Sequence, residues 1–197
     1  MKKRTFDIVA QQKIKRLAES ALSILPFTGS IDYRYEHVGD GTFTDTIIGA
    51  VNRNPNILIV NIEWYESTNE QDIRDIIHHK ARHLYQWYQV NKYRSGIKTD
   101  ENERIVKQWS DNLLPGNYIC NTPRTEIQYF KQPVEFDAYC YSTFLRAIES
   151  CDANGNISGS YVDYPGIGDE LIRQVTQNIQ SFSSIDEIMK IQKILKV

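Results

Sequence analysis

The segment that decides the fold runs from residue 69 to residue 94 and reads NEQDIRDIIHHKARHLYQWYQVNKYR. Ser67 and Thr68 can cap its start, acidic residues occupy its first turn, and Gly96 follows its end. An apolar stripe recurs at helical spacing, made by Ile73, Ile77, Ala81, Leu84 and Tyr88. The sequence therefore predicts one long helix that packs its apolar face on another layer.

A sheet is the expected partner of that helix. An opening helix over 7–25 ends at Pro26, and strand-like runs follow over 31–37, 42–51 and 56–65, separated by turns. The third run is the most apolar and suits the middle of a small sheet. This order predicts a helix followed by a small antiparallel sheet.

Helices dominate the rest of the chain. We expect them over 101–113, 133–151, 169–182 and 185–197, with irregular segments over 115–132 and 152–168. Pro133 suits the first turn of its helix. The fold class is thus α+β, with a single domain over 1–197. Its core spans about 5–150, and a helical addition over about 169–197 covers that core or makes a subunit contact.

Composition excludes several function classes. The chain has 197 residues, 41% hydrophobic residues, 24% charged residues and a net charge of −2. These values are typical of a globular protein, and the net charge does not favour binding to nucleic acid. No secretory signal or membrane anchor is expected, because the most apolar stretch, 57–62, is too short to span a bilayer. Three irregularly spaced cysteines favour reduced thiols and a cytoplasmic location.

Two histidines on the long helix are candidate metal ligands. His79 and His83 are four residues apart, so they project from neighbouring turns of one face and can grip one ion. In the metallopeptidase pattern H-E-x-x-H, the glutamate acts as general base on the attacking water. Here the pattern is H-K-x-x-H, with Lys80 in the position of the glutamate. A histidine pair alone is more often a polar face or a packed pair than a ligand set.

A second segment adds a carboxylate. Residues 133–139 read PVEFDAY and open a later helix, in which Glu135 lies 52 residues beyond His83. Together the two segments resemble the gluzincin-type minimal metallopeptidases, which read H-E-x-x-H-x-x-Q and later P-x-E-x-x-A. The matching residues are His79, His83, Gln86, Pro133, Glu135 and Ala138.

The resemblance implies a zincin-like fold and a zinc site. His79, His83 and Glu135 would be the ligands, with an open fourth position. Asp137 would be an acceptor that orients a ligand histidine, and Gln86 would lie in the same surrounding layer. Ordinary helix-start chemistry is the alternative, because acidic residues after a proline favour the positive end of a helix without any metal.

Lys80 conflicts with ordinary hydrolysis. A protonated lysine cannot accept a proton, and its charge opposes a cation. Two unit charges ~4 Å apart interact by ~4 kcal/mol at an effective dielectric of ~20, and a divalent ion doubles that as an upper bound. Three explanations stay open: a natural pseudoenzyme, an inactivated variant, or a deprotonated lysine that acts as an unusual base.

The function expected is therefore a zincin-like protein impaired in catalysis. One alternative is a non-enzymatic interaction or inhibitor module on the same fold. Another is an active metal-dependent hydrolase with Lys80 in a new role. The expected partner is a peptide or protein segment in a cleft beside the sheet edge, with the strand over 56–65 as the pairing strand.

Neighbouring residues are assigned to structure rather than chemistry. His78 points about a quarter turn away from the pair and is expected to be structural or on the surface. Arg82 and Arg94 are assigned to the solvated face of the helix. Tyr139 and Tyr141 could face the cleft, but core packing is the favoured interpretation.

Overall fold

A computed structural model describes residues 6–39, 49–51, 56–152 and 164–196. The chain mixes helices and strands, as expected. In chain order the elements are α1 (Ile8–Ser23), β1 (Asp32–Glu36), β2 (Gly49–Val51), β3 (Ile57–Asn61), α2 (Ile62–Ser67), α3 (Glu70–Arg94), α4 (Glu103–Asn112), α5 (Glu126–Lys131), α6 (Pro133–Glu149), α7 (Gly168–Gln180) and α8 (Ile185–Leu195).

The prediction of an antiparallel sheet is wrong for one of the two strand pairs. The strand order is β1-β3-β2. Strand β1 pairs parallel to β3, with Asp32 opposite Ile57, whereas β2 pairs antiparallel to β3, with Gly49 opposite Val60. Because β3 sits between the other two strands, consecutive strands β1 and β2 are not neighbours, and the parallel pair requires a crossover.

The burial of β3 explains its central place. All five of its residues are buried, which suits a strand covered on both faces. Leu58 and Val60 belong to the main core, and Ile57 and Ile59 form a separate buried pair. The expected middle position is confirmed, so the pairing strand of a peptide cleft cannot be this one. Both of its edges are already occupied.

The strand predicted over 56–65 ends early. At Asn61 the chain turns into α2, because the Asn61 side chain accepts a hydrogen bond from the backbone N–H of Trp64 and caps the new helix. Most of the run expected over 42–51 lies outside the described residues. Of the irregular stretch expected over 115–132, the part from Glu126 to Lys131 is helical.

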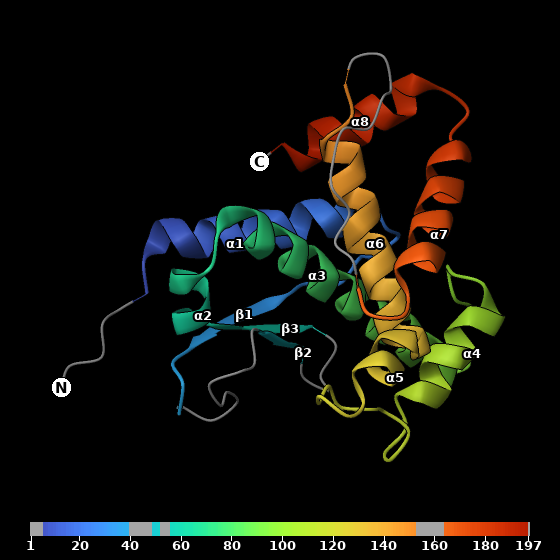
Figure 1. The fold of residues 1–197 in the computed structure, drawn as a ribbon, viewed down its shortest axis with the longest axis horizontal. Coiled ribbons are helices and arrows are strands. Elements are labelled where there is room, and N and C mark those ends of the chain that lie inside the picture. The colour runs from blue at the N-terminus through green and yellow to red at the C-terminus, as the bar shows by residue number, and fades with distance from the viewer. Residues whose placement is uncertain (1–5, 40–48, 52–55, 153–163, 197) are drawn as a thin grey trace.

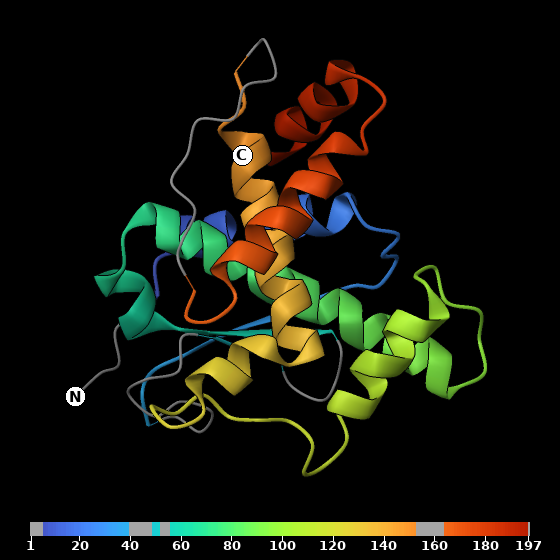
Figure 2. The same cartoon turned by 45° about the vertical axis from the view of Figure 1, so that its right-hand side comes forward.

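Helix α3 packs against α1, α4, α6 and the sheet. Asn69, not the predicted Ser67 or Thr68, caps it by accepting from the N–H of Asp72. The predicted stripe is buried at four positions, Ile73, Ile77, Ala81 and Leu84. Helices α1 and α3 pack together on the same side of the sheet, and α6 crosses α3 (Figures 1 and 2).

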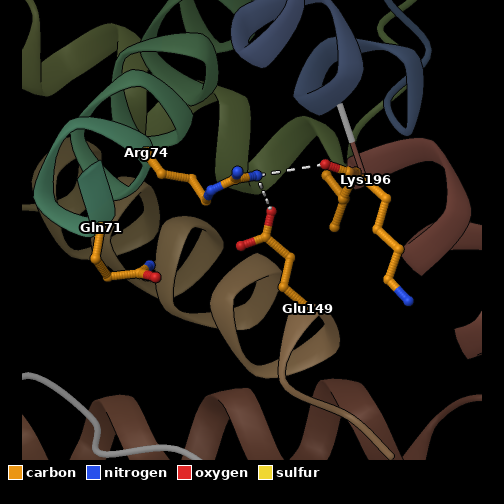
Figure 3. A pocket seen from close by; sticks show the side chains of 5 residues that line it. Gln71, Arg74, Glu149 and Lys196 are labelled. Carbon is orange, nitrogen blue, oxygen red and sulfur yellow. Dashed lines mark hydrogen bonds and ion pairs between the residues drawn. The ribbon is translucent and has the colours of Figure 1, made fainter.

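The closing helices cover α6. Helix α7 packs along α6, and α8 lies against the end of α6 remote from the sheet and also contacts α1 (Figures 1 and 2). Beside this contact lies a shallow pocket, shown in Figure 3, where the Arg74 guanidinium bonds the Glu149 carboxylate at 2.9 Å and the Leu195 carbonyl at 3.4 Å. Helices α7 and α8 therefore pack on α6, and α8 also on α1.

Candidate metal centre

The histidine pair is buried where α3 faces α6. His79 is 4% exposed and His83 is 9% exposed, and their Nε2 atoms are 2.9 Å apart. The α-helical spacing of four residues places one imidazole a turn above the other, with the rings edge to face at 4.5 Å. The two side chains therefore direct their Nε2 atoms at one point.

Glu135 completes the group from the first turn of α6. The residue is 1% exposed. One oxygen, Oε2, lies 3.2 Å from His79 Nε2, and the other, Oε1, lies 3.3 Å from His83 Nε2. Ala138, one turn further along α6, is fully buried, which is consistent with the close helix approach that its small side chain permits.

The three side chains could hold a metal ion. Tetrahedral zinc binds nitrogen and oxygen at about 2.0–2.1 Å, which separates ligand atoms by about 3.3 Å. The two Nε2 atoms are 2.9 Å apart, and each lies 3.2 or 3.3 Å from a different oxygen of the Glu135 carboxylate, which are distances close to that value. Small side-chain shifts would suffice to admit an ion, so the donor set fits a His₂Glu metal site.

Charge states in the group also suit a ligand set. Burial lowers the pKa of His79 to about 3, so its ring is neutral at pH 7. Burial would raise the pKa of Glu135, but the adjacent histidines His83 and His79 outweigh it and hold that pKa well below its usual range. Metal ligands must be neutral imidazole and ionised carboxylate, and these two groups meet that condition.

Two tyrosines bind the far side of the Glu135 carboxylate. The Tyr118 hydroxyl donates to Oε1 at 2.6 Å, and the Tyr129 hydroxyl donates to Oε2 at 2.8 Å. Burial, and then the charge of Glu135, raises the pKa of both hydroxyls, so both remain donors. Sequence analysis missed these residues, because they come from the segment before α6 and no fixed spacing relates them to the histidines.

Gln86 and Asp137 lie beside His83, but not in the predicted arrangement. Gln86 Oε1 is 2.7 Å from His83 Nδ1. Asp137 was expected to accept directly from a ligand histidine. Its oxygens instead accept from Gln86 Nε2 at 2.7 Å and from Arg82. Asp137 therefore reaches His83 only through the glutamine.

The assignment of Arg82 to the solvated face is wrong, and of the two alternatives for His78 the structure supports the structural one. Arg82 is only 8% exposed, contrary to the prediction, because it pairs with Asp137 and lies over aromatic rings. His78 is fully buried, which agrees with a structural role and not with a surface one. Burial lowers its pKa to about 3, and within the described part of the chain neither ring nitrogen has a hydrogen-bond partner.

The aromatic residues of α6 divide between site and core. The Tyr139 ring contacts the His79 ring, with centres 4.3 Å apart and planes tilted by 50°, and is part of the wall of the site. Tyr141 is a core residue whose hydroxyl donates to the carbonyl of Ala21. Only the second therefore follows the favoured interpretation of core packing alone.

Lys80 is half-buried next to the group. In the described part of the chain it has no hydrogen bond or ion pair. Burial lowers the pKa of its ammonium, and the negative charge of Glu135 opposes that shift. Its charge also acts on His79 and favours the neutral ring there. The lysine is therefore electrostatically coupled to two of the three candidate ligands, Glu135 and His79.

Comparison with protein-family models, curated proteins and solved structures finds no match for this chain. Among the described residues, no helix is long and apolar enough to cross a membrane.

Proposed function

We propose that this chain is a zincin-like metal-binding protein in which Lys80 prevents ordinary peptide hydrolysis. The observation that supports it is the convergence of His79, His83 and Glu135, with donor separations close to those of a tetrahedral site. Zinc is the ion proposed, because two imidazoles and one carboxylate are a known catalytic zinc set.

A bound zinc ion would act as a Lewis acid that polarises a carbonyl oxygen. The residues of the chain would hold and shape that site. Tyr118 and Tyr129 keep the Glu135 carboxylate in place by donating to its two oxygens. Lys80 stands where a general base is needed, and in its protonated form it has no lone pair to accept a proton. The chain thus retains ligands without the usual proton acceptor.

A peptide segment is the proposed partner, bound at a sheet edge beside the centre. Among the described strands, β1 and β2 are the edges, and β2 contacts α3, the helix of the candidate ligands. An extended peptide adding to β2 would pair through its backbone. This replaces β3 as the proposed pairing strand, since β3 has neighbours on both sides.

A second candidate function is an interaction module that takes no metal. One observation favours it: the ligand group already has internal partners. Both Glu135 oxygens accept from tyrosines, and both face histidine nitrogens. A buried polar cluster that satisfies itself can be retained for structure alone.

Metal content decides between the two. Purified wild type and Lys80→Glu would be dialysed against zinc, and their zinc content would be measured by elemental analysis. His83→Ala, which lacks one of the three candidate ligands, is the control. We expect about one zinc per chain in Lys80→Glu, none in His83→Ala, and weaker binding in wild type because of the lysine charge.

Peptidase assays on the same samples complete the test. We expect no hydrolysis by wild type. Zinc in neither wild type nor Lys80→Glu would overturn the metal proposal and favour the interaction module. Zinc-dependent hydrolysis by wild type would instead contradict the proposed loss of catalysis and assign Lys80 a catalytic role.

A further inference from the structure

We propose that Gln86 is a positioning residue that fixes His83 in the tautomer a metal requires, with Asp137 and Arg82 holding Gln86 in the necessary orientation. The consequence for metal affinity rests on the proposed function. The tautomer itself is a property of the metal-free protein and can be measured there.

The orientation of the Gln86 amide follows from its partners. Its Nε2 lies 2.9 Å from the carbonyl oxygen of Val134 and 2.7 Å from Asp137 Oδ2. A carbonyl and a carboxylate can only accept, so the NH₂ group must face them. Turning the amide over would place its oxygen against two acceptors. Oε1 must therefore be the atom that lies 2.7 Å from His83 Nδ1.

This orientation determines the tautomer of His83. Because the Gln86 carbonyl oxygen can only accept, Nδ1 of His83 must carry the proton and donate. In a neutral imidazole the lone pair is then on Nε2, the atom that faces His79 and Glu135. Gln86 thereby leaves the metal-facing nitrogen free to bind.

Arg82 extends this series of hydrogen bonds into the core. Its Nε and Nη2 bond the two oxygens of Asp137 at 2.7 and 3.0 Å. The guanidinium carbon lies 5.0 to 5.3 Å from the ring centres of Tyr85, Trp109 and Tyr141. The bidentate pair and the rings restrict the arginine, so the carboxylate that receives the Gln86 amide is itself fixed.

His79 provides an internal contrast. Its Nδ1 is buried and has no hydrogen-bond partner among the residues that the structure describes. Nothing on that side of the ring favours one tautomer over the other. The two candidate ligands therefore differ in the metal-free protein. His83 already presents a bare Nε2, whereas His79 Nε2 must carry its proton to donate to His83 Nε2 and the Glu135 carboxylate, and that proton has to leave Nε2 when a metal binds.

Helix packing is the competing explanation, because Gln86 and Arg82 both bridge α3 to α6. Gln89 offers a matched control on the same helix. It is fully buried, and its amide makes two hydrogen bonds, both to Asp100, whereas the Gln86 amide makes three, one of them to His83. A Gln→Met change at either position removes a buried amide of similar size, but only one of them touches the ligand group.

The test compares Gln86→Met with Gln89→Met, each without metal, by ¹⁵N NMR of the histidine rings. In wild type and Gln89→Met we expect His83 protonated at Nδ1. In Gln86→Met we expect that preference to be lost, and zinc affinity to fall by ~10–100-fold. Gln89→Met should keep wild-type zinc affinity whatever its effect on stability.

Asp137→Asn is the second variant, to be used if Gln86→Met does not fold. The amide introduced at position 137 can present an N–H donor to Gln86 Nε2, which needs an acceptor there, so the Nδ1-protonated fraction of His83 should fall. A wild-type His83 protonated at Nε2, or a tautomer unchanged in both variants, would overturn the inference. If the tautomer behaves as expected but wild type and Lys80→Glu take no zinc, the positioning role stands and the metal function falls.

Discussion

Helices α3 and α6 meet at two polar clusters, one at each end of their contact. The far cluster pairs each cation with an anion: Arg74 with Glu149 at 2.9 Å, and Arg146 with Asp75 at 2.7 Å (Figure 3 shows the first pair). The near cluster directs two histidines and two tyrosines at one carboxylate, Glu135.

The difference teaches how to separate a site from a structural cluster. In the far cluster the charges cancel in pairs, and Arg74 also ties α8 to the helix pair. In the near cluster three ligand atoms converge and Lys80 has no described partner. Burial of polar groups is common to both clusters, so convergence on one point is the feature that indicates binding.

The sharpest way to break this comparison is to neutralise one carboxylate in each cluster. Glu135→Gln removes a ligand charge and should lower zinc affinity by more than the ~10–100-fold typical of a supporting residue. Glu149→Gln should leave zinc affinity unchanged, because it lies in the far cluster. Both would be measured by competition with a zinc chelator in the Lys80→Glu background. Equal losses in both variants would remove the distinction.

The far cluster should respond in stability, and with a defined pH dependence. Arg146→Met leaves the Asp75 carboxylate buried with Gln71 as its remaining hydrogen-bond partner, which should cost about 2–3 kcal/mol of unfolding free energy at pH 7. Burial already raises the pKa of Asp75, against the effect of Arg146.

The sign of the pH effect follows from that raised pKa. A carboxyl whose pKa is raised in the folded state destabilises that state least when it is protonated. The loss of unfolding free energy in Arg146→Met should therefore shrink as the pH falls through the folded-state pKa of Asp75. Glu149 and Asp72 are nearby carboxyls that titrate in both proteins, so the difference between variant and wild type is the quantity to measure. Urea unfolding at several pH values would supply it. A loss that grows on acidification would contradict the prediction.

The smallest expected effect separates the tyrosines of the site from one in the core. Tyr118→Phe, Tyr129→Phe and Tyr141→Phe each remove one hydroxyl bond, so each should cost about 1–2 kcal/mol of unfolding free energy. Only the first two should also weaken zinc binding, because only they hold Glu135. Thermal unfolding with and without zinc tests this, and a zinc effect in Tyr141→Phe would blur the boundary between site and core.

Local features of the chain were predictable because local residues cause them. The amphipathic stripe set helix α3, and four-residue spacing set the histidines on one face. Pro133 marked the start of α6 and so the place of Glu135. These features depend on helical geometry and on the conformational limits of proline, which act within a few residues.

Contacts between distant segments were not predictable in the same way. The parallel pairing of β1 with β3 depends on which strand the core buries on both faces. The convergence of Tyr118 and Tyr129 on Glu135, and the burial of Arg82, depend on how α3, α5 and α6 pack. The sequence by itself determined the longer helices and the candidate ligands, but not the short helices α2 and α5. Only the tertiary structure decided their hydrogen-bond partners, because side chains from separate elements meet through packing and not through spacing along the chain.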